Sequence, residues 1–234
     1  MNPPKLIEIR KNILKKNDEL AQGLRTRFAT HGVFVANFVS SPGTGKTELL
    51  KYTMARLTER FAVAAIVGDV ETENDAIRLR KSGAPAYQVE THNMCHLESF
   101  HIEKAIAAAS SQFRVEELDL LIVENVGNLV CTSAFDLGED LQVVLVSTTE
   151  GEDKPLKYPK IFDRSDVCIL TKMDLAEALE FDHAQMRASI DAVKPGMPVF
   201  EVSAKTGWGM DAWIDYLAGR VEEKQAVETP AWVS

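Results

Sequence analysis

The chain has 234 residues and a formal net charge of −9, with 45% hydrophobic and 26% charged residues. This acidic balance argues against sequence-independent binding to nucleic acid or to an anionic membrane, because both require clustered lysine and arginine. No apolar run approaches the roughly 18 residues of a membrane span, and the first residues do not form a signal-peptide core, so we expect a cytoplasmic protein with neither partner.

Residues 1–30 predict an amphipathic helix at the start of the chain. Apolar residues recur near one face, at Leu6, Ile9, Ile13, Leu20, Leu24 and Phe28. The prolines at 3 and 4 and the glycine at 32 are expected boundaries. Plain packing is our default interpretation of such a face, and no further role is assigned to the helix.

From residue 33 onward, apolar strands alternate with helices. Strands are expected over 33–40, 61–68, 85–90, 118–124, 141–148, 166–171 and 198–203, and helices over 46–60, 72–82, 96–113, 156–164, 182–194 and 208–223. Near-continuous apolar strands are typical of a parallel sheet covered on both faces. We therefore expect an α/β doubly wound, mostly parallel sheet over 31–222, with ligands at the carboxyl ends of its strands and a frayed tail over 223–234.

The segment 40–47, Ser-Ser-Pro-Gly-Thr-Gly-Lys-Thr, lies between the first strand and the next helix. This is the context of a phosphate-binding loop, in which backbone N–H groups surround a phosphate and Lys46 adds a positive charge. The Thr47 hydroxyl is suited to Mg²⁺, although Ser40 replaces the usual first glycine. We assign nucleotide binding to Ser41, Gly43, Thr44, Gly45, Lys46, Thr47 and Glu48.

Two strand ends that face this loop carry acidic residues. Glu124 stands where an aspartate is usual, and its longer arm favours a water-mediated contact with Mg²⁺; Gly127 follows and can approach the γ-phosphate. Asp69 is a second candidate to bind Mg²⁺ or to position water, and Asp75 is a weaker one that could equally be an ordinary helix-start acid. The predicted catalytic set is Lys46, Asp69, Asp75, Glu124 and Gly127, and the Mg²⁺ set is Thr47, Asp69 and Glu124.

Two later segments resemble the guanine-reading motifs of GTPases: 171–174, Thr-Lys-Met-Asp, and 203–205, Ser-Ala-Lys. The Asp174 carboxylate would accept from the donor pair that guanine presents and adenine lacks, while the Lys172 stem would pack on the base. A backbone N–H among Ser203, Ala204 and Lys205 would meet the guanine carbonyl. Thr171 replaces the common asparagine, which leaves the loop-bracing hydrogen bond open. Together the motifs favour GTP over ATP.

Cys95, His96 and Cys131 form a candidate metal site in loops that follow predicted strands. Two thiolates and one imidazole suit Zn²⁺, Ni²⁺ or copper, and a water or a second subunit could complete the coordination. Three cysteines do not suggest a disulfide framework, so we expect reduced thiols.

Other cysteine and histidine residues are weaker metal-ligand candidates. Cys168 lies within an apolar strand and is interpreted as a core residue. His92 and His101 are near enough in sequence to serve as spare ligands, although exposed histidines are the commoner explanation.

Five segments together resemble HypB, the hydrogenase nickel-incorporation GTPase, over about residues 30–220. They are 40–47, 68–72 (Gly-Asp-Val-Glu-Thr), 95–97 (Cys-His-Leu), 124–131 (Glu-Asn-Val-Gly-Asn-Leu-Val-Cys) and 149–155 (Thr-Glu-Gly-Glu-Asp-Lys-Pro). The resemblance implies a P-loop GTPase of the SIMIBI type that helps to deliver nickel to the [NiFe]-hydrogenase large subunit together with the accessory protein HypA. It also implies a homodimer linked to GTP, with Cys95, His96 and Cys131 holding Ni²⁺ or Zn²⁺ at the subunit interface.

Two departures from the family pattern limit this resemblance. Thr132 stands where proline is usual, and the residues before the phosphate loop contain neither a Cys-x-x-Cys-Gly-Cys site nor a His-rich tract, so those functions are not carried over.

Our hypothesis is a switch in which GTP orders the loops at Asp69 and Gly127 and thereby moves the thiolate of Cys131. Hydrolysis is expected to be slow, since no arginine finger is identifiable in the sequence. The alternatives are a urease-accessory type of GTPase, a P-loop kinase and a non-catalytic metal store.

Overall fold

The computed structural model describes residues 3–69, 74–91 and 94–228; the side chains of 3–10, 69 and 228 lie outside this description. A parallel sheet of seven strands runs through the molecule in the order β3-β2-β4-β1-β5-β6-β7. The strands are β1 (Phe34–Ser40), β2 (Val63–Asp69), β3 (Ala86–Glu90), β4 (Leu120–Glu124), β5 (Leu141–Ser147), β6 (Val167–Thr171) and β7 (Val199–Glu201). The predicted doubly wound α/β fold is confirmed.

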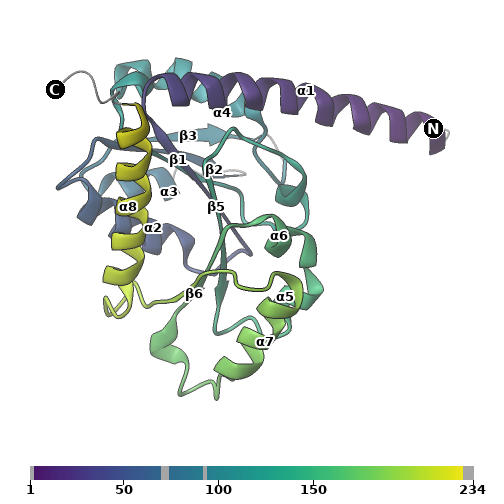
Figure 1. Cartoon of the computed structure of the whole chain (residues 1–234), viewed down its shortest axis with the longest axis vertical. Helices are drawn as coiled ribbons and strands as arrows, with labels where there is room; N and C mark the ends of the chain where they lie inside the picture. Colours follow the sequence, from purple (N-terminus) through teal and green to yellow (C-terminus); the bar gives the residue numbers. More distant parts are fainter. Residues whose placement is uncertain (1–2, 70–73, 92–93, 229–234) are drawn as a thin grey trace.

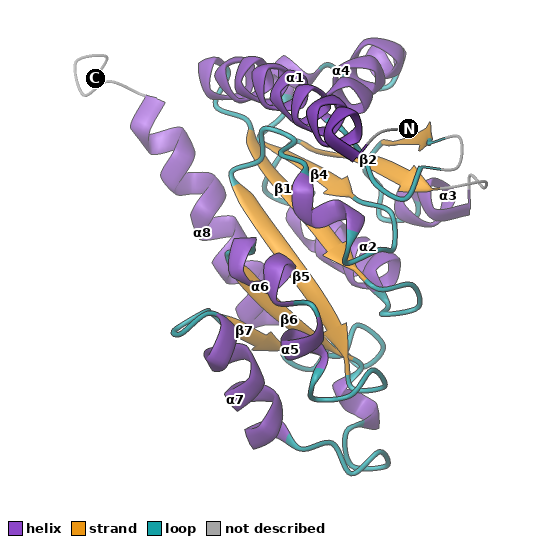
Figure 2. Cartoon of the chain, turned by 90° about the vertical axis from the view of Figure 1, so that its right-hand side faces the viewer, coloured by secondary structure: helices purple, strands orange, loops and turns teal. Residues whose placement is uncertain are grey.

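Helices cover both faces of this sheet (Figure 2). They are α1 (Pro3–Thr30), α2 (Lys46–Leu57), α3 (Asn74–Arg80), α4 (Ser99–Ala108), α5 (Lys154–Lys157), α6 (Pro159–Arg164), α7 (His183–Val193) and α8 (Met210–Glu228). Successive residues of β1 serve opposite layers: Phe34 and Ala36 pack with α2, α3 and α8, whereas Val35 packs with α1 and α4. None of the helices in the described ranges is both long and apolar enough to cross a lipid bilayer.

Several helix boundaries differ from those predicted, and α2 and α4 end earlier than expected, at Leu57 and Ala108. The helix expected over 156–164 is divided into α5 and α6, because Pro159 begins the second helix and disfavours helical geometry in the residue before it. The helix expected over 96–113 begins only at Ser99. The last helix continues to Glu228, so the first part of the predicted tail is helical, and Lys224 Nζ bonds the Asp140 carboxylate at 2.6 and 2.8 Å.

The N-terminal helix α1 lies alongside α4 and extends past the body of the protein (Figure 1). Its buried residues begin at Asn17 and continue with Ala21, Leu24 and Phe28, whereas Ile13 is 47% exposed. The predicted apolar face therefore packs on the sheet layer only in the second half of the helix, and the side chains of the two earliest predicted positions lie outside the described residues.

Candidate nucleotide and metal sites

The phosphate-binding loop connects the end of β1 to the start of α2. Gly43 and Gly45 have φ values of 76° and 95°, in the left-handed region that glycine adopts without strain. The loop and the first turn of α2 line a pocket of about 440 Å³, together with Asp75, Arg78 and Glu124. A pocket with a helix N-terminus at its base attracts anions, because the free N–H groups and the helix dipole both favour negative charge.

Lys46 and Glu124 lie together inside this pocket. Lys46 Nζ is 3.5 Å from Glu124 Oε1, and the Thr47 hydroxyl donates to the same oxygen at 2.7 Å. The other carboxylate oxygen, Oε2, is buried and has no hydrogen-bond partner among the described residues. Burial raises the pKa of Glu124, against the opposing influence of Lys46 and Thr47. A buried carboxylate oxygen without a partner beside a threonine hydroxyl fits Mg²⁺, which Thr47 and Glu124 would hold.

The remaining predicted catalytic residues are placed differently. Gly127 lies against the phosphate loop so closely that a Cβ there would be 3.2 Å from the Pro42 backbone. Asp75, in the first turn of α3, lines the pocket and pairs with Arg78 at 3.2 Å. Asp69 ends β2, but its side chain and the following residues 70–73 lie outside the described part of the chain.

The two guanine-motif segments meet beside the phosphate loop. Ser203 Oγ donates to Asp174 at 2.7 Å and thereby lowers the pKa of that carboxyl, and Lys205 Nζ lies 3.7 Å from the same group. Thr171, which replaces the common asparagine, also braces the loop: its hydroxyl donates to the Thr44 carbonyl at 2.6 Å. Lys172 Nζ adds a second bond, to the Gly43 carbonyl at 2.7 Å.

Glu150 lies in the segment after β5 and supports the phosphate loop, a role that was not predicted from the sequence. Its Oε2 accepts from the Thr44 hydroxyl at 2.8 Å and from the Ser147 backbone at 2.9 Å, and its other oxygen pairs with Lys154 at 3.2 Å. The only signal in the sequence is its place in the 149–155 motif.

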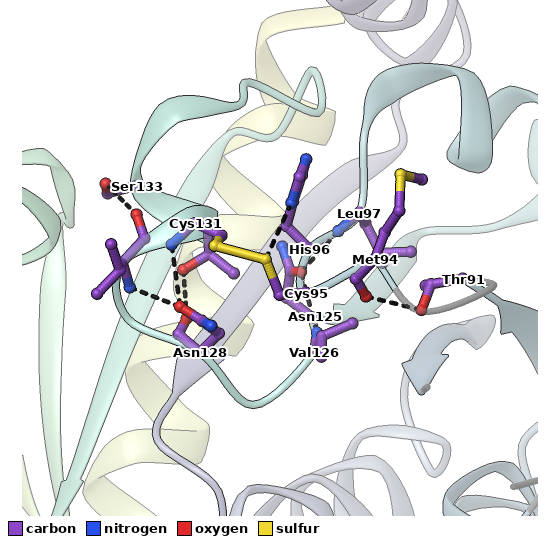
Figure 3. The surroundings of a disulfide bond; sticks show 12 residues. Thr91, Met94, Cys95, His96, Leu97, Asn125, Val126, Asn128, Cys131 and Ser133 are labelled. Carbon is purple, nitrogen blue, oxygen red and sulfur yellow. Dashed lines mark hydrogen bonds between the residues drawn. A yellow bond between two sulfur atoms is a disulfide. The ribbon is translucent and has the colours of Figure 1, made fainter. Parts of the chain in front are cut away.

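The three predicted metal-ligand residues lie close together (Figure 3). Their ligand atoms are all within 4.8 Å of one another. Cys95 and Cys131 are joined as a disulfide with Cα atoms 6.2 Å apart, so the expectation of reduced thiols is wrong for this structure. An odd cysteine count cannot reveal that the fold brings two of the three together. Reduction would yield two thiolates beside one imidazole, a donor set that fits Ni²⁺ or Zn²⁺.

His96 is oriented by its neighbours. Its Nε2 lies 3.2 Å from a carboxylate oxygen of Glu98, and its Nδ1 lies 3.7 Å from the Cys95 sulfur. The ring stacks on Phe135 with centroids 4.0 Å apart. A carboxylate on one ring nitrogen leaves the other free to bind a metal and increases its basicity. Glu98 was not among the predicted site residues, although its place two residues after a predicted histidine ligand is visible in the sequence.

His101 and Cys168 do not join this cluster. His101 is buried and accepts from the Glu98 backbone N–H at 3.0 Å within the N-terminal cap of α4, and burial lowers its pKa. His92 lies outside the described residues. Cys168 is fully buried in β6, which raises its thiol pKa to about 12.

Asn125 connects the nucleotide pocket to the metal-ligand cluster. Its backbone carbonyl accepts from Lys46 Nζ at 2.5 Å, and its side-chain oxygen accepts from the Leu97 N–H at 3.0 Å. Leu97 directly follows His96 and is fully buried against Gly68 of β2, where a Cβ would lie within 2.9 Å of the leucine side chain. One residue therefore contacts the phosphate-loop lysine and one of the two ligand-bearing segments.

Known proteins are similar to this chain in sequence and in fold. A family model described as "CobW/HypB/UreG, nucleotide-binding domain" matches residues 34–201. The hydrogenase maturation factor HypB of Rhizobium leguminosarum bv. viciae is 45% identical over 223 residues, covering 94% of this chain and 73% of that protein. The hydrogenase/urease maturation factor HypB of Helicobacter pylori strain ATCC 700392 / 26695 is 39% identical over 217 residues, covering 93% and 89%. The crystal structure of HypB from Helicobacter pylori in complex with nickel has a TM-score of 0.83 at 39% identity, covering 89% of this chain and 96% of that one.

Proposed function

Because this chain belongs to the CobW/HypB/UreG family and, within it, to the HypB hydrogenase maturation factors, we propose that it hydrolyses GTP and uses the nucleotide state to control delivery of nickel to [NiFe]-hydrogenase. The observation that carries the coupling is the double role of Asn125, which bonds the phosphate-loop lysine and the segment that bears Cys95 and His96.

The nucleotide part of the proposal rests on the contacts around Lys46. Lys46 Nζ donates to the Asn125 carbonyl. The phosphates of GTP would compete for this ammonium group, so binding would release the carbonyl and change the position of the 125–131 loop. Thr47 and Glu124 would hold Mg²⁺, which would supply positive charge to neutralise the charge that develops on the phosphates. Asp174 would select guanine.

The cargo part of the proposal rests on the sulfur and imidazole cluster. In the reduced chain, Cys95, His96 and Cys131 would hold Ni²⁺ or Zn²⁺, with the remaining position filled by water or by a second copy of the chain. The GTP-linked homodimer, the HypA-type partner, the hydrogenase large subunit as client and the cytoplasmic location stay predictions.

Lys46→Ala tests the enzymatic part. We expect GTP hydrolysis to fall to background and ATP hydrolysis to be far slower than GTP hydrolysis in the unaltered protein. Arg56→Ala, at the far end of the same helix, where it pairs with Asp211, is the control and should hydrolyse GTP normally. Equal turnover of ATP and GTP would point instead to a kinase or ATPase.

The coupling is tested by titrating metal into the reduced protein with GDP and with a non-hydrolysable GTP analogue. We expect different dissociation constants for the two forms. Identical dissociation constants would reject the switch and leave a GTPase beside an independent metal site. If, in addition, Lys46→Ala left metal binding and metal release unchanged, the chain would be a simple metal store.

Urease is a second candidate client, because the related Helicobacter pylori protein is named a hydrogenase/urease maturation factor. Nickel incorporation into the two apo-enzymes, measured side by side with this chain, distinguishes the clients.

A further inference from the structure

Asn17 is a polar residue on the packing face of α1, and its side chain is only 3% exposed. Burying an amide is unfavourable unless its donor and acceptor groups are bonded. Both are: Nδ2 donates to the Asp136 carbonyl at 2.8 Å, and Oδ1 accepts from the Ser99 backbone N–H at 2.9 Å. The Asn17 amide therefore bonds two backbone groups that are far apart in the chain.

These two groups belong to the two segments that carry the cargo-metal ligands. Ser99 begins α4 three residues after His96, and Asp136 follows Cys131 in the adjacent loop. The Ser99 hydroxyl also donates to the Asp136 carbonyl, at 2.7 Å. Asn17, Ser99 and Asp136 thus form a closed set of three hydrogen bonds, which we call the Asn17 hub, and the hub sets the spacing of one ligand segment from the other.

The hub lies next to the groups that orient His96. Glu98, which precedes Ser99, contacts His96 Nε2, and Phe135, which precedes Asp136, stacks on the His96 ring. A shift of either segment at the hub would therefore move a direct support of the imidazole. Arg25, two turns further along α1, strengthens the attachment through bonds of 2.8 and 2.9 Å to both oxygens of the Asp136 carboxylate.

We propose that Asn17 is a positioning residue for the cargo-metal site: through the hub, α1 holds the Cys95–His96 segment and the Cys131 segment at the spacing that metal binding requires. The proposal rests on the proposed metal function and adds a role for α1, which packing alone does not explain. Ala21, Leu24 and Phe28 supply the packing, and an apolar side chain at position 17 would supply more of it without an amide to satisfy.

Two substitutions and one control test the proposal in the full-length reduced protein. Asn17→Leu removes both bonds but keeps a side chain of four heavy atoms branched at Cγ, and Asn17→Asp keeps the acceptor for Ser99 N–H but loses the donor to Asp136. Arg27→Ala is the control, because Arg27 anchors the same helix through Glu116, away from both ligand segments. The readouts are affinity for Zn²⁺ and Ni²⁺ against a chromophoric chelator, the thiolate-to-nickel charge-transfer spectrum, kcat and KM for GTP, and thermal unfolding.

We expect Asn17→Leu to weaken metal binding about tenfold or more, the loss typical when support of a ligand is removed, and to alter the charge-transfer spectrum. The metal affinity of Asn17→Asp should lie between that of Asn17→Leu and that of the unaltered protein. In both variants kcat and KM for GTP should stay within about twofold, and Arg27→Ala should keep full metal affinity. Equal metal affinity in Asn17→Leu and the unaltered protein, or an equal loss in Arg27→Ala, would overturn the proposal while leaving the metal function intact. Failure of the unaltered reduced protein to bind metal would overturn the metal function itself. If Asn17→Leu does not fold, Asn17→Asp decides on the same readouts.

Discussion

At the scale of single residues, the candidate metal and nucleotide sites depend on residues that each bond two partners. The Glu98 carboxylate accepts from the first turn of α4 and also contacts His96 Nε2. Asn125 bonds Lys46 through its backbone and Leu97 through its side chain. Replacing such a residue separates two functions that the fold has joined.

Glu98→Gln should weaken binding of Ni²⁺ or Zn²⁺ by the reduced protein about tenfold to a hundredfold. The amide keeps the size of the side chain but no longer holds a negative charge against the imidazole, so His96 becomes a poorer ligand. Metal competition titration measures the loss, and GTP turnover should not change. Glu103→Gln, at an exposed position of the same helix, is the matched control; if both variants bind alike, the assigned role of Glu98 is wrong.

Gly127→Ala should raise KM for GTP and lower stability by about 1–3 kcal/mol, the usual range for an overpacked site. The added methyl group would lie 3.2 Å from the Pro42 backbone and displace the phosphate loop. Steady-state kinetics and urea unfolding measure the two effects. Gly23→Ala, in the middle of α1 with no atom within 4 Å of the new Cβ, should instead stabilise the protein by about 0.5–1 kcal/mol.

At the scale of elements, α1 is attached to the loop before β5 through a charged pair. Burial acts to raise the pKa of Asp136, but the hydrogen bonds from Arg25 and from the Gly138 N–H outweigh it and hold that pKa below its usual range. A carboxyl whose pKa is lowered by folding stabilises the fold fully when the pH is above its pKa in the unfolded state. This contribution is lost as the pH falls through its pKa in the folded state.

Asp136→Asn should therefore lower the free energy of unfolding at pH 7 by roughly 1–2 kcal/mol, somewhat less than the about 1.5–3 kcal/mol of a buried hydrogen bond to a charged group, because water screens this partly exposed pair. The gap from the unaltered protein should stay constant near neutral pH, begin to narrow near the ordinary aspartate pKa of about 3.9, and close only as the pH falls through the lower pKa of the folded state. Urea unfolding at a series of pH values gives both curves. Asp18→Asn, at an exposed position of α1, should show no gap at any pH; a gap for Asp136→Asn that does not narrow as the pH is lowered from about 5 to about 2 would contradict the assignment.

At the scale of the whole molecule, the cargo site exists only when two loops 36 residues apart in sequence meet with reduced sulfurs. A disulfide offers no thiolate, and the thiolate is the metal-binding form. Under the proposed function, the redox state of Cys95 and Cys131 would therefore decide whether the protein can bind cargo, while the nucleotide pocket contains no cysteine among its lining residues.

The oxidised protein should bind no Ni²⁺ or Zn²⁺ at this site yet retain nucleotide binding. After reduction, two thiols should react rapidly with a chromogenic disulfide reagent, and Cys168 should react only on unfolding, because it is fully buried with a pKa of about 12. Thiol counts and metal titrations before and after reduction check this. Cys168→Ala is the control and should leave the count of rapidly reacting thiols unchanged.

The sequence by itself determined the order of strands and helices, the parallel sheet, the phosphate loop at 40–47 and the guanine motifs ending at Asp174 and Lys205. These features rest on local spacing, or on apolar periodicity summed over many residues, so a single irregular position does not hide them.

Only the tertiary structure decided how the sites are supported and connected. The disulfide, the contact of Glu150 with Thr44, the link through Asn125 and the hub at Asn17 join residues between 28 and 119 positions apart. Each depends on one donor meeting one acceptor after the layers have packed. Local periodicity does not reveal these long-range hydrogen bonds, because the sequence around a buried amide or carboxylate looks the same whether or not a distant partner is present in the fold.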